Sequence, residues 1–192
     1  MSRTIDTSES FFVLDSAPEG ETLRARTDAL TMDNPKLVEA PRCPACGQYT
    51  GGMSWLPPFR VELRAWGREF GDLAFVSADE ILVSERSLAL WHQNRLVGLS
   101  GFEQVEVEKV QGDRQLVGKP PRYFRAAVKV TRAEIDYDSS GFEWERPPDC
   151  PECRLGHLLK RWRRILIKPG TWTGEDLFIP FQMNVFLASK RF

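Results

Sequence analysis

The four cysteines of this chain form two Cys-Pro-x-Cys pairs, which contain Cys43 with Cys46 and Cys150 with Cys153. A C-x-x-C pair can present two thiolates to one metal ion, and a tetrahedral Zn²⁺ takes four such ligands at about 2.3 Å. The two pairs together predict one structural zinc site per chain. A site closed by four thiolates has no open position for water or substrate, so the pattern indicates stabilisation and not catalysis.

Other uses of the cysteines fit the sequence less well. A redox motif needs only one C-x-x-C, usually near a βαβ pattern, and no such pattern surrounds either pair. Disulfide frameworks are typical of secreted proteins, whereas Met1–Asp6 shows no basic region followed by the apolar stretch of a signal peptide. Iron in the same four-thiolate cage stays open as an alternative to zinc.

The two pairs lie far apart in the sequence. Between Cys46 and Cys150 there are 103 residues, many more than a compact zinc finger has. Because the cost of closing a loop grows only logarithmically with its length, a metal ion could still join them. We therefore expect the site to clasp a larger domain.

Each pair has the residues of a tight turn. Pro44 and Pro151 fix φ after the first cysteine, and Gly47 permits the positive φ that a metal-binding knuckle often needs. Arg154 stands where the second pair would have the matching glycine. We expect the second knuckle to be more strained or to have a different shape.

Length and composition predict one domain. The 192 residues, of which 42% are hydrophobic, suffice for a core. Residues 1–10 are polar and are predicted to be flexible. Residues 11–192 are predicted to form a single α+β domain, mainly an antiparallel sheet with a few short helices. Its zinc-ribbon-like subregion, which contains the four cysteines, is formed by residues 41–52 and 148–158.

Residue patterns place the secondary structure coarsely. Ser77 with Glu80 has the form of a capping box at the start of a helix, and Ser84 could cap a second helix from residue 85 to about residue 94. Alternating or β-branched segments predict strands. These strands are expected at residues 11–14, 61–66, 102–110, 123–130 and 165–167, the fourth beside the third and antiparallel to it.

One internal similarity is visible. Residues 71–75 precede Leu82-Val83-Ser84-Glu85-Arg86, and residues 175–178 precede Leu187-Ala188-Ser189-Lys190-Arg191-Phe192. Both segments have an acidic residue with an apolar pair, followed by Ser-x-Arg where a helix would begin. An internal repeat and a chance similarity both explain this pattern.

Charge is unevenly distributed along the second half. Residues 133–145 are acidic and aromatic, and residues 154–168 are basic and include Trp162. The two runs could be solvated faces, could face each other, or could bind a basic partner and a phosphate backbone respectively. The candidate partner-binding residues are Glu134, Asp136, Tyr137, Asp138 and Trp144.

Several function classes are disfavoured. The net charge of −1 argues against nucleic acid and anionic membranes as partners. There is no apolar run near 18 residues that would span a membrane, and we expect a cytoplasmic protein. The two histidines, His92 and His157, belong to no catalytic motif, so we expect no enzymatic activity.

The order of motifs resembles the double-CXXCG motif proteins of myxobacteria and other proteobacteria. It comprises the Phe-Phe strand at residues 11–12, the two Cys-Pro-x-Cys pairs, the segments at 71–75, 82–86 and 98–102, and Asp176-Leu177-Phe178 followed by Ser189-Lys190-Arg191-Phe192. The resemblance implies an immunity protein that binds and neutralises a cognate polymorphic toxin, the product of an adjacent gene, through contacts and not through chemistry. The alternative is a zinc-ribbon adaptor that binds nucleic acid or another protein.

Overall fold

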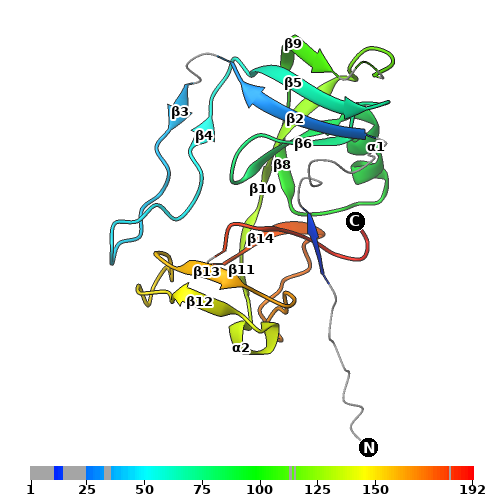
Figure 1. The fold of residues 1–192 in the computed structure, drawn as a ribbon. Coiled ribbons are helices and arrows are strands. Elements are labelled where there is room, and N and C mark those ends of the chain that lie inside the picture. The colour runs from blue at the N-terminus through cyan, green and yellow to red at the C-terminus, as the bar shows by residue number, and fades with distance from the viewer. Residues whose placement is uncertain (1–10, 15–24, 33–35, 113, 115, 182) are drawn as a thin grey trace, which may run out of the picture.

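The computed structural model describes residues 11–14, 25–32, 36–112, 114, 116–181 and 183–192. Within them the chain is an α+β protein made mostly of antiparallel strands with two short helices, as the sequence predicts (Figure 1). Residues 1–10, which we predicted to be flexible, lie outside the described part. No helix in the described part is long and apolar enough to cross a membrane.

The elements alternate along the chain as follows. The strands are β1 Phe12–Leu14, β2 Ala25–Thr31, β3 Leu37–Val38, β4 Ser54–Trp55, β5 Arg60–Gly67, β6 Leu73–Phe75, β7 Glu80–Ser84, β8 Leu99–Gln104, β9 Glu106–Gly112, β10 Tyr123–Val128, β11 Val130–Glu134, β12 Glu143–Arg146, β13 Leu158–Arg161, β14 Leu177–Phe181 and β15 Phe186–Ala188. The helices are α1 Glu85–Gln93 and α2 Tyr137–Ser140.

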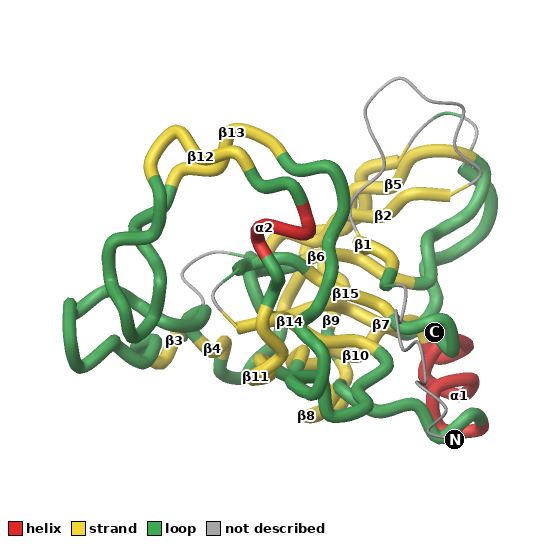
Figure 2. The backbone as a smooth tube through the Cα atoms, turned by 90° about the horizontal axis from the view of Figure 1, so that it is seen from below, coloured by secondary structure: helices red, strands yellow, loops and turns green. Residues whose placement is uncertain are grey.

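Two four-stranded sheets form the centre of the molecule. Their strand orders are β1-β15-β14-β11 and β6-β7-β10-β8. A three-stranded sheet, β2-β5-β9, and two hairpins, β3-β4 and β12-β13, complete the fold (Figure 2). The hairpins extend from the central sheets, and each of them carries one cysteine pair.

Three strands of each four-stranded sheet repeat one topology. The β6–β7 hairpin pairs Leu73 with Val83, and the β14–β15 hairpin pairs Leu177 with Ala188. Beside them, β10 adds to β7 and β1 adds to β15, both antiparallel. The described parts of residues 12–84 and 123–189 therefore form a first and a second repeat of the same arrangement.

Each repeat completes the other. β1 opens the first repeat but pairs with β15 at the end of the second, whereas β10 opens the second repeat and pairs with β7 at the end of the first. Because each sheet includes a strand from the other half of the chain, the two repeats are expected to fold together.

Matching hydrogen bonds confirm the repeat at the segments that the sequence singled out. Ser84 Oγ donates to Asp72 Oδ1 at 2.6 Å, and Ser189 Oγ donates to Asp176 Oδ1 at 2.8 Å. In both cases the serine N–H also donates to the aspartate carbonyl, at 2.8 Å. The similarity between these segments therefore reflects shared local structure.

The core consists of three apolar clusters that follow from the alternation of side chains across the strands. One contains Val61, Leu63, Leu82 and Tyr123 between β5, β7 and β10. Two others fill the space around the β14–β15 hairpin and α1. A fourth, small cluster consists of Cys43, Cys150 and Cys153 with Leu155.

Helix α1 confirms the prediction made from its cap. Ser84 Oγ accepts from Ser87 N at 3.1 Å, which satisfies one of the free N–H groups of the first turn. The predicted capping box at Ser77 is wrong, because Glu80 begins β7 and its carboxylate is buried against Arg125. The pattern failed because Glu80 has a tertiary partner that local spacing does not reveal.

Two predicted strands differ in the structure. The segment from 102 to 110 is divided between β8, which is antiparallel to β10 as expected, and β9, which is parallel to β5 in another sheet. Ile167 makes one isolated bridge with Ile135 and no strand. The counterpart of this bridge in the first repeat is the antiparallel pair of strands β2 and β5, which ends at Thr31 and Val61. The second repeat therefore has a single bridge where the first repeat has a strand pair.

Candidate metal centre

The β3–β4 and β12–β13 hairpins position the four cysteines. Cys43 and Cys46 lie between β3 and β4, and Cys150 and Cys153 lie between β12 and β13. Each repeat thus contributes one pair. The two pairs meet although 107 positions separate corresponding cysteines.

The two knuckles have the same backbone geometry. Gly47 N donates to Cys43 O at 2.9 Å, and Arg154 N donates to Cys150 O at 2.9 Å. Gly47 has φ +74° and Arg154 has φ +50°. The arginine therefore adopts the left-handed conformation that the turn requires. Our expectation that the second knuckle has a different shape is wrong. The expectation that it is more strained is supported, because a positive φ is unfavourable for a residue with a Cβ atom.

The four sulfurs have the spacing of a tetrahedral site. All four Sγ atoms lie within 4.8 Å of one another. Cys43 and Cys150 are 3.9 Å apart at sulfur, and Cys46 and Cys153 are 3.5 Å apart. Ligands at about 2.3 Å from a tetrahedral ion would be about 3.8 Å from each other, so a zinc ion fits among these residues. None of the four is in a disulfide.

Backbone N–H groups point at the thiols as they do toward thiolates in metal knuckles. The N–H of Cys153 donates to Cys150, and this hydrogen bond is the largest cause that lowers the pKa of Cys150 to about 7. Burial raises the pKa of Cys153 to about 12. A bound dication would supply the charge that holds both as thiolates.

Aromatic and basic side chains surround the second knuckle. His157 Nδ1 lies 3.0 Å from the Arg154 carbonyl oxygen, and its ring packs 5.0 Å from that of Trp144. In the described part of the chain the candidate ligand cluster contains the four cysteines and not His157. This histidine thus helps to support the knuckle.

The predicted acidic and basic runs face each other. Lys168 Nζ donates to Glu134 Oε2 at 2.9 Å, and Arg161 Nη2 donates to Glu143 Oε1 at 2.5 Å. Lys168 lowers the pKa of Glu134 through this hydrogen bond. The runs are therefore partly neutralised within the chain.

The other candidate partner-binding residues have different structural roles. Asp136 caps α2, because its Oδ1 accepts from Ser139 N at 3.1 Å. Tyr137 and Trp144 pack edge to face with ring centroids 5.1 Å apart. Asp138 is exposed. An interface at this surface stays a prediction. Asp138, whose side chain is exposed, is the candidate that a partner could contact with the smallest change to the fold.

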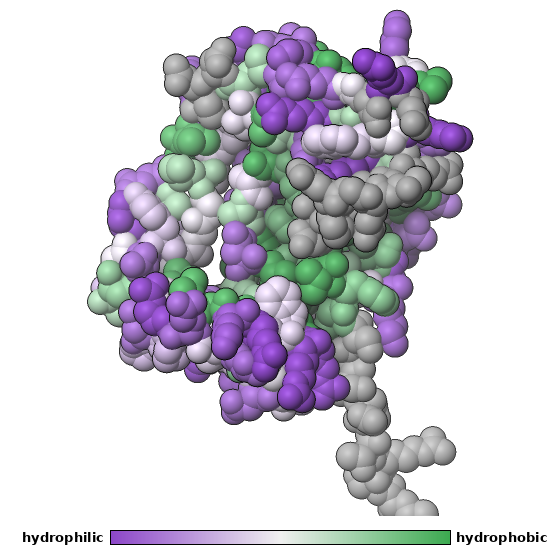
Figure 3. All heavy atoms as spheres, in the orientation of Figure 1, coloured by the Kyte–Doolittle hydropathy of each residue, from purple (hydrophilic) through white to green (hydrophobic). Residues whose placement is uncertain are grey.

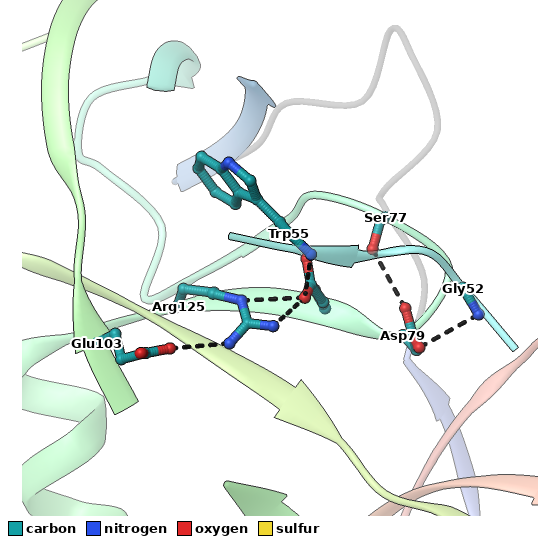
Figure 4. A network of polar contacts seen from close by, with 7 residues as sticks. Gly52, Trp55, Ser77, Asp79, Glu103 and Arg125 are labelled. Carbon is teal, nitrogen blue, oxygen red and sulfur yellow. Dashed lines mark hydrogen bonds and ion pairs between the residues drawn. The ribbon is translucent and has the colours of Figure 1, made fainter. Parts of the chain in front are cut away.

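The structure contains a buried ion pair that the sequence did not reveal. Arg125 donates to Glu80 Oε1 through Nε at 3.0 Å and also through Nη2, and to Glu103 Oε2 through Nη1 at 2.9 Å (Figure 4). The backbone N–H of Trp55 donates to the same Glu80 oxygen at 3.3 Å. Nearby, Asp79 accepts from Gly52 N at 3.3 Å. These bonds attach the β3–β4 hairpin to the central sheets. The only sign of this ion pair in the sequence was Glu80, a charged residue directly before the apolar residues of β7.

No protein-family model, curated protein or solved structure matches this chain. The fold and the site therefore define its class by themselves. The protein is a mainly antiparallel α+β protein with a cluster of four cysteines that could hold a metal ion such as zinc.

Proposed function

We propose that this protein is an immunity protein that binds a cognate toxin and neutralises it, with one structural zinc ion. The observation that carries the proposal is the meeting of four thiols from two distant hairpins. Four thiolates would complete the coordination of zinc, so the ion would fix the shape of a binding scaffold and would not take part in a reaction. The resemblance to double-CXXCG proteins supplies the toxin as partner.

The β3–β4 hairpin offers a surface for a protein partner. Five large apolar side chains are exposed on this segment, namely Leu37, Val38, Tyr49, Met53 and Leu56. Figure 3 shows hydrophobic residues on this side of the molecule. Exposed apolar clusters on one element are typical of protein interfaces, and they support binding as the function.

The acidic face around α2 is the second surface that supports the proposal. Asp138 and Glu145 are exposed there. Unlike Glu134 and Glu143, which form ion pairs with Lys168 and Arg161, they stand outside the ion pairs between the acidic and basic runs in the described part of the chain. Exposed carboxylates of this kind would speed association with a basic toxin domain.

A pull-down with the product of the adjacent gene tests the proposal directly. We expect a stoichiometric complex that survives nuclease treatment, one zinc per chain, and protection of cells that express the toxin. Absence of a complex together with absence of protection would overturn the immunity function.

Charge reversal separates the two surfaces. Asp138→Lys with Glu145→Lys should slow association several-fold if the acidic face contacts the toxin. Met53→Asp should weaken the complex if the β3–β4 hairpin contacts the toxin. Glu106→Lys is the matched control, because Glu106 is exposed on β9 and belongs to neither surface.

A zinc-ribbon adaptor for nucleic acid is the second candidate. Trp162 is 45% exposed within the basic run and stacks on Phe142 at 6.2 Å between centroids. An exposed aromatic ring among arginines can stack on a base. Binding to single-stranded DNA or RNA that weakens steeply with salt, and that Trp162→Ala abolishes, would favour this function.

A further inference from the structure

The two repeats differ at the outer edge of one strand. In the first repeat, β10 pairs with β7 on one side and with β8 on the other. In the second repeat the counterpart of β10 is β1, which pairs with β15 and has no described strand on its other side (Figure 2). The second repeat therefore has an open position where the first repeat has β8.

The backbone of Val13 faces this open edge. Ser189 N donates to Asp176 O on the side of β14, so the backbone groups of Ala188, the preceding residue, point toward β1. Phe12 is directly opposite Ala188 and is therefore the residue whose backbone faces β15. Because these groups alternate along a strand, the N–H and C=O of Val13 point away from β15.

The side chains at this edge are apolar and exposed. Phe12 is 60% exposed and Val13 is 41% exposed, and they lie on opposite faces of the sheet. Their neighbours hold the strand in place, because the Phe11 ring packs 5.3 Å from that of Trp172 and Leu14 packs against the core around α1 and the β14–β15 hairpin. An exposed apolar strand with open backbone groups is a template for pairing with another strand.

Strand β1 also lacks the charged residues that usually protect an edge. At the other edge of the same sheet, β11 carries Arg132, which is exposed, and Glu134. In the other four-stranded sheet, the edge strand β8 carries Glu103. The three residues of β1 are phenylalanine, valine and leucine. The charges that discourage pairing at β8 and β11 are therefore absent from β1.

The sequence of β1 is complementary to itself. If a second β1 runs antiparallel with Val13 opposite Val13, the two valines exchange both of their hydrogen bonds, and each Phe12 lies opposite a Leu14. In the first repeat, by contrast, Arg125 of β10 lies opposite Glu103 of β8 and pairs with it. Val13 replaces Arg125 in the second repeat, so the strand that fills the open position needs an apolar residue there, and β1 itself supplies one.

We propose that the open edge of β1 is a dimerisation surface, at which a second copy of this chain adds its own β1 in the antiparallel direction. The second copy takes the place that β8 has beside β10. A two-fold axis at Val13 then joins the two four-stranded sheets into one continuous sheet. The contact is short, so the dimer is weak, with a Kd on the order of 100 µM. The inference does not depend on the proposed immunity function.

Sedimentation equilibrium of the full chain between about 5 µM and about 1 mM tests the proposal, and we expect a reversible equilibrium between monomer and dimer. Val13→Lys places like charges opposite each other and should weaken the dimer at least about tenfold. Val130→Lys is the matched control, because Val130 is 45% exposed on β11, at the other edge of the same sheet, and this variant should dimerise as the wild type does. Val13→Thr keeps the β-branched shape and the backbone hydrogen bonds, and should also dimerise.

Hydrogen exchange of single amides, followed by NMR, shows whether β1 forms the contact. The Val13 amide should exchange about threefold more slowly in protein at about 1 mM than at about 50 µM, because more of the chain is then dimeric. The Phe12 amide, which faces β15, should change little. This measurement uses the wild-type protein, so it decides the question even if Val13→Lys does not fold.

A protein that stays monomeric up to about 1 mM would overturn the proposal, and so would a dimer that a folded Val13→Lys variant leaves unchanged. Protection of the Val13 amide that is the same at all concentrations would mean that another part of the same chain covers the edge. Protection that develops only with the product of the adjacent gene would assign the edge to that partner. Each of these two results would also overturn pairing between copies.

Discussion

Gly47 and Arg154 occupy the same position in the two cysteine knuckles, with φ values of +74° and +50°. Each donates its N–H at 2.9 Å to the carbonyl of the first cysteine of its pair. The same turn is thus formed once by glycine, which adopts a positive φ readily, and once by arginine, for which a positive φ is strained.

Gly47→Ala should lower the free energy of unfolding by about 1 kcal/mol, because an added Cβ meets no atom within 4 Å and only the left-handed backbone opposes it. Arg154→Gly should raise it by a smaller amount, since glycine relieves the strain but gains entropy in the unfolded chain. Urea unfolding of zinc-loaded protein measures both. A Gly47→Ala protein as stable as the wild type would contradict this account.

Removal of the metal should destabilise both repeats together. Zinc binding at a structural site is largely folding energy, so chelation should lower the free energy of unfolding by about 5 kcal/mol or more. For a chain of this size that corresponds to a fall in Tm of about 10 °C or more. Calorimetry with and without chelator measures the effect.

The same experiment has matched variants. Cys150→Ser should reproduce the loss of zinc and of stability, whereas Ala45→Ser, exposed in the first knuckle, should retain one zinc per chain. An unchanged thermal transition after chelation would show that the four cysteines do not clasp the domain.

The buried pair of Glu80 and Arg125 should behave non-additively. Glu80→Val alone should cost about 3–5 kcal/mol, because it leaves the guanidinium buried with one exposed partner, Glu103. Replacing both residues with valine should cost less than about 2 kcal/mol. A double-mutant cycle by chemical denaturation gives the coupling, and additive effects of the two changes would contradict it.

Acid should destabilise the fold partly through Glu175. Burial acts to raise the pKa of this carboxyl, but the hydrogen bonds from Lys129 and Thr173 outweigh burial and lower the pKa below its ordinary value of 4.5. A pKa that is lower in the folded state gives stability above the unfolded value, and this stability is lost as the pH falls through the folded pKa. Unfolding free energy should therefore decline below about pH 4.5.

Two variants isolate this contribution. Glu175→Gln removes the titrating group, and Lys129→Met removes the cation 2.5 Å from Glu175 Oε1. Both should make the dependence of stability on pH shallower between about pH 3 and 5. A slope that neither variant changes would assign the acid sensitivity to other carboxylates.

Asp72 and Asp176 make the same bond to serine in different surroundings. The Asp176 side chain is 1% exposed and also accepts from Val97 N at 3.0 Å, whereas the side chain of Asp72 is 40% exposed. Asp176→Ala should cost about 3 kcal/mol because buried donors lose their acceptor, and Asp72→Ala about 1 kcal/mol. Equal losses in thermal unfolding would show that burial does not distinguish the repeats.

Local chemistry in the sequence determined the elements that satisfy themselves. Ser84 marked the start of α1, alternation marked β5 and β10, and the two Cys-Pro-x-Cys pairs identified the candidate ligands, because caps, strand faces and chelating pairs depend on residues a few positions apart. The similarity between the segments after Asp72 and Asp176 was visible, but only their matching hydrogen bonds distinguished a repeat from chance.

The tertiary structure alone decided what depends on distant partners. It placed β1 beside β15 and β10 beside β7, so that each repeat completes the other. It turned Glu80 from an apparent helix cap into half of a buried ion pair. Strand pairings depend on which apolar faces are buried together, and a buried carboxylate needs a cationic partner. The spacing of residues along the sequence indicates neither the paired strand nor the cationic partner.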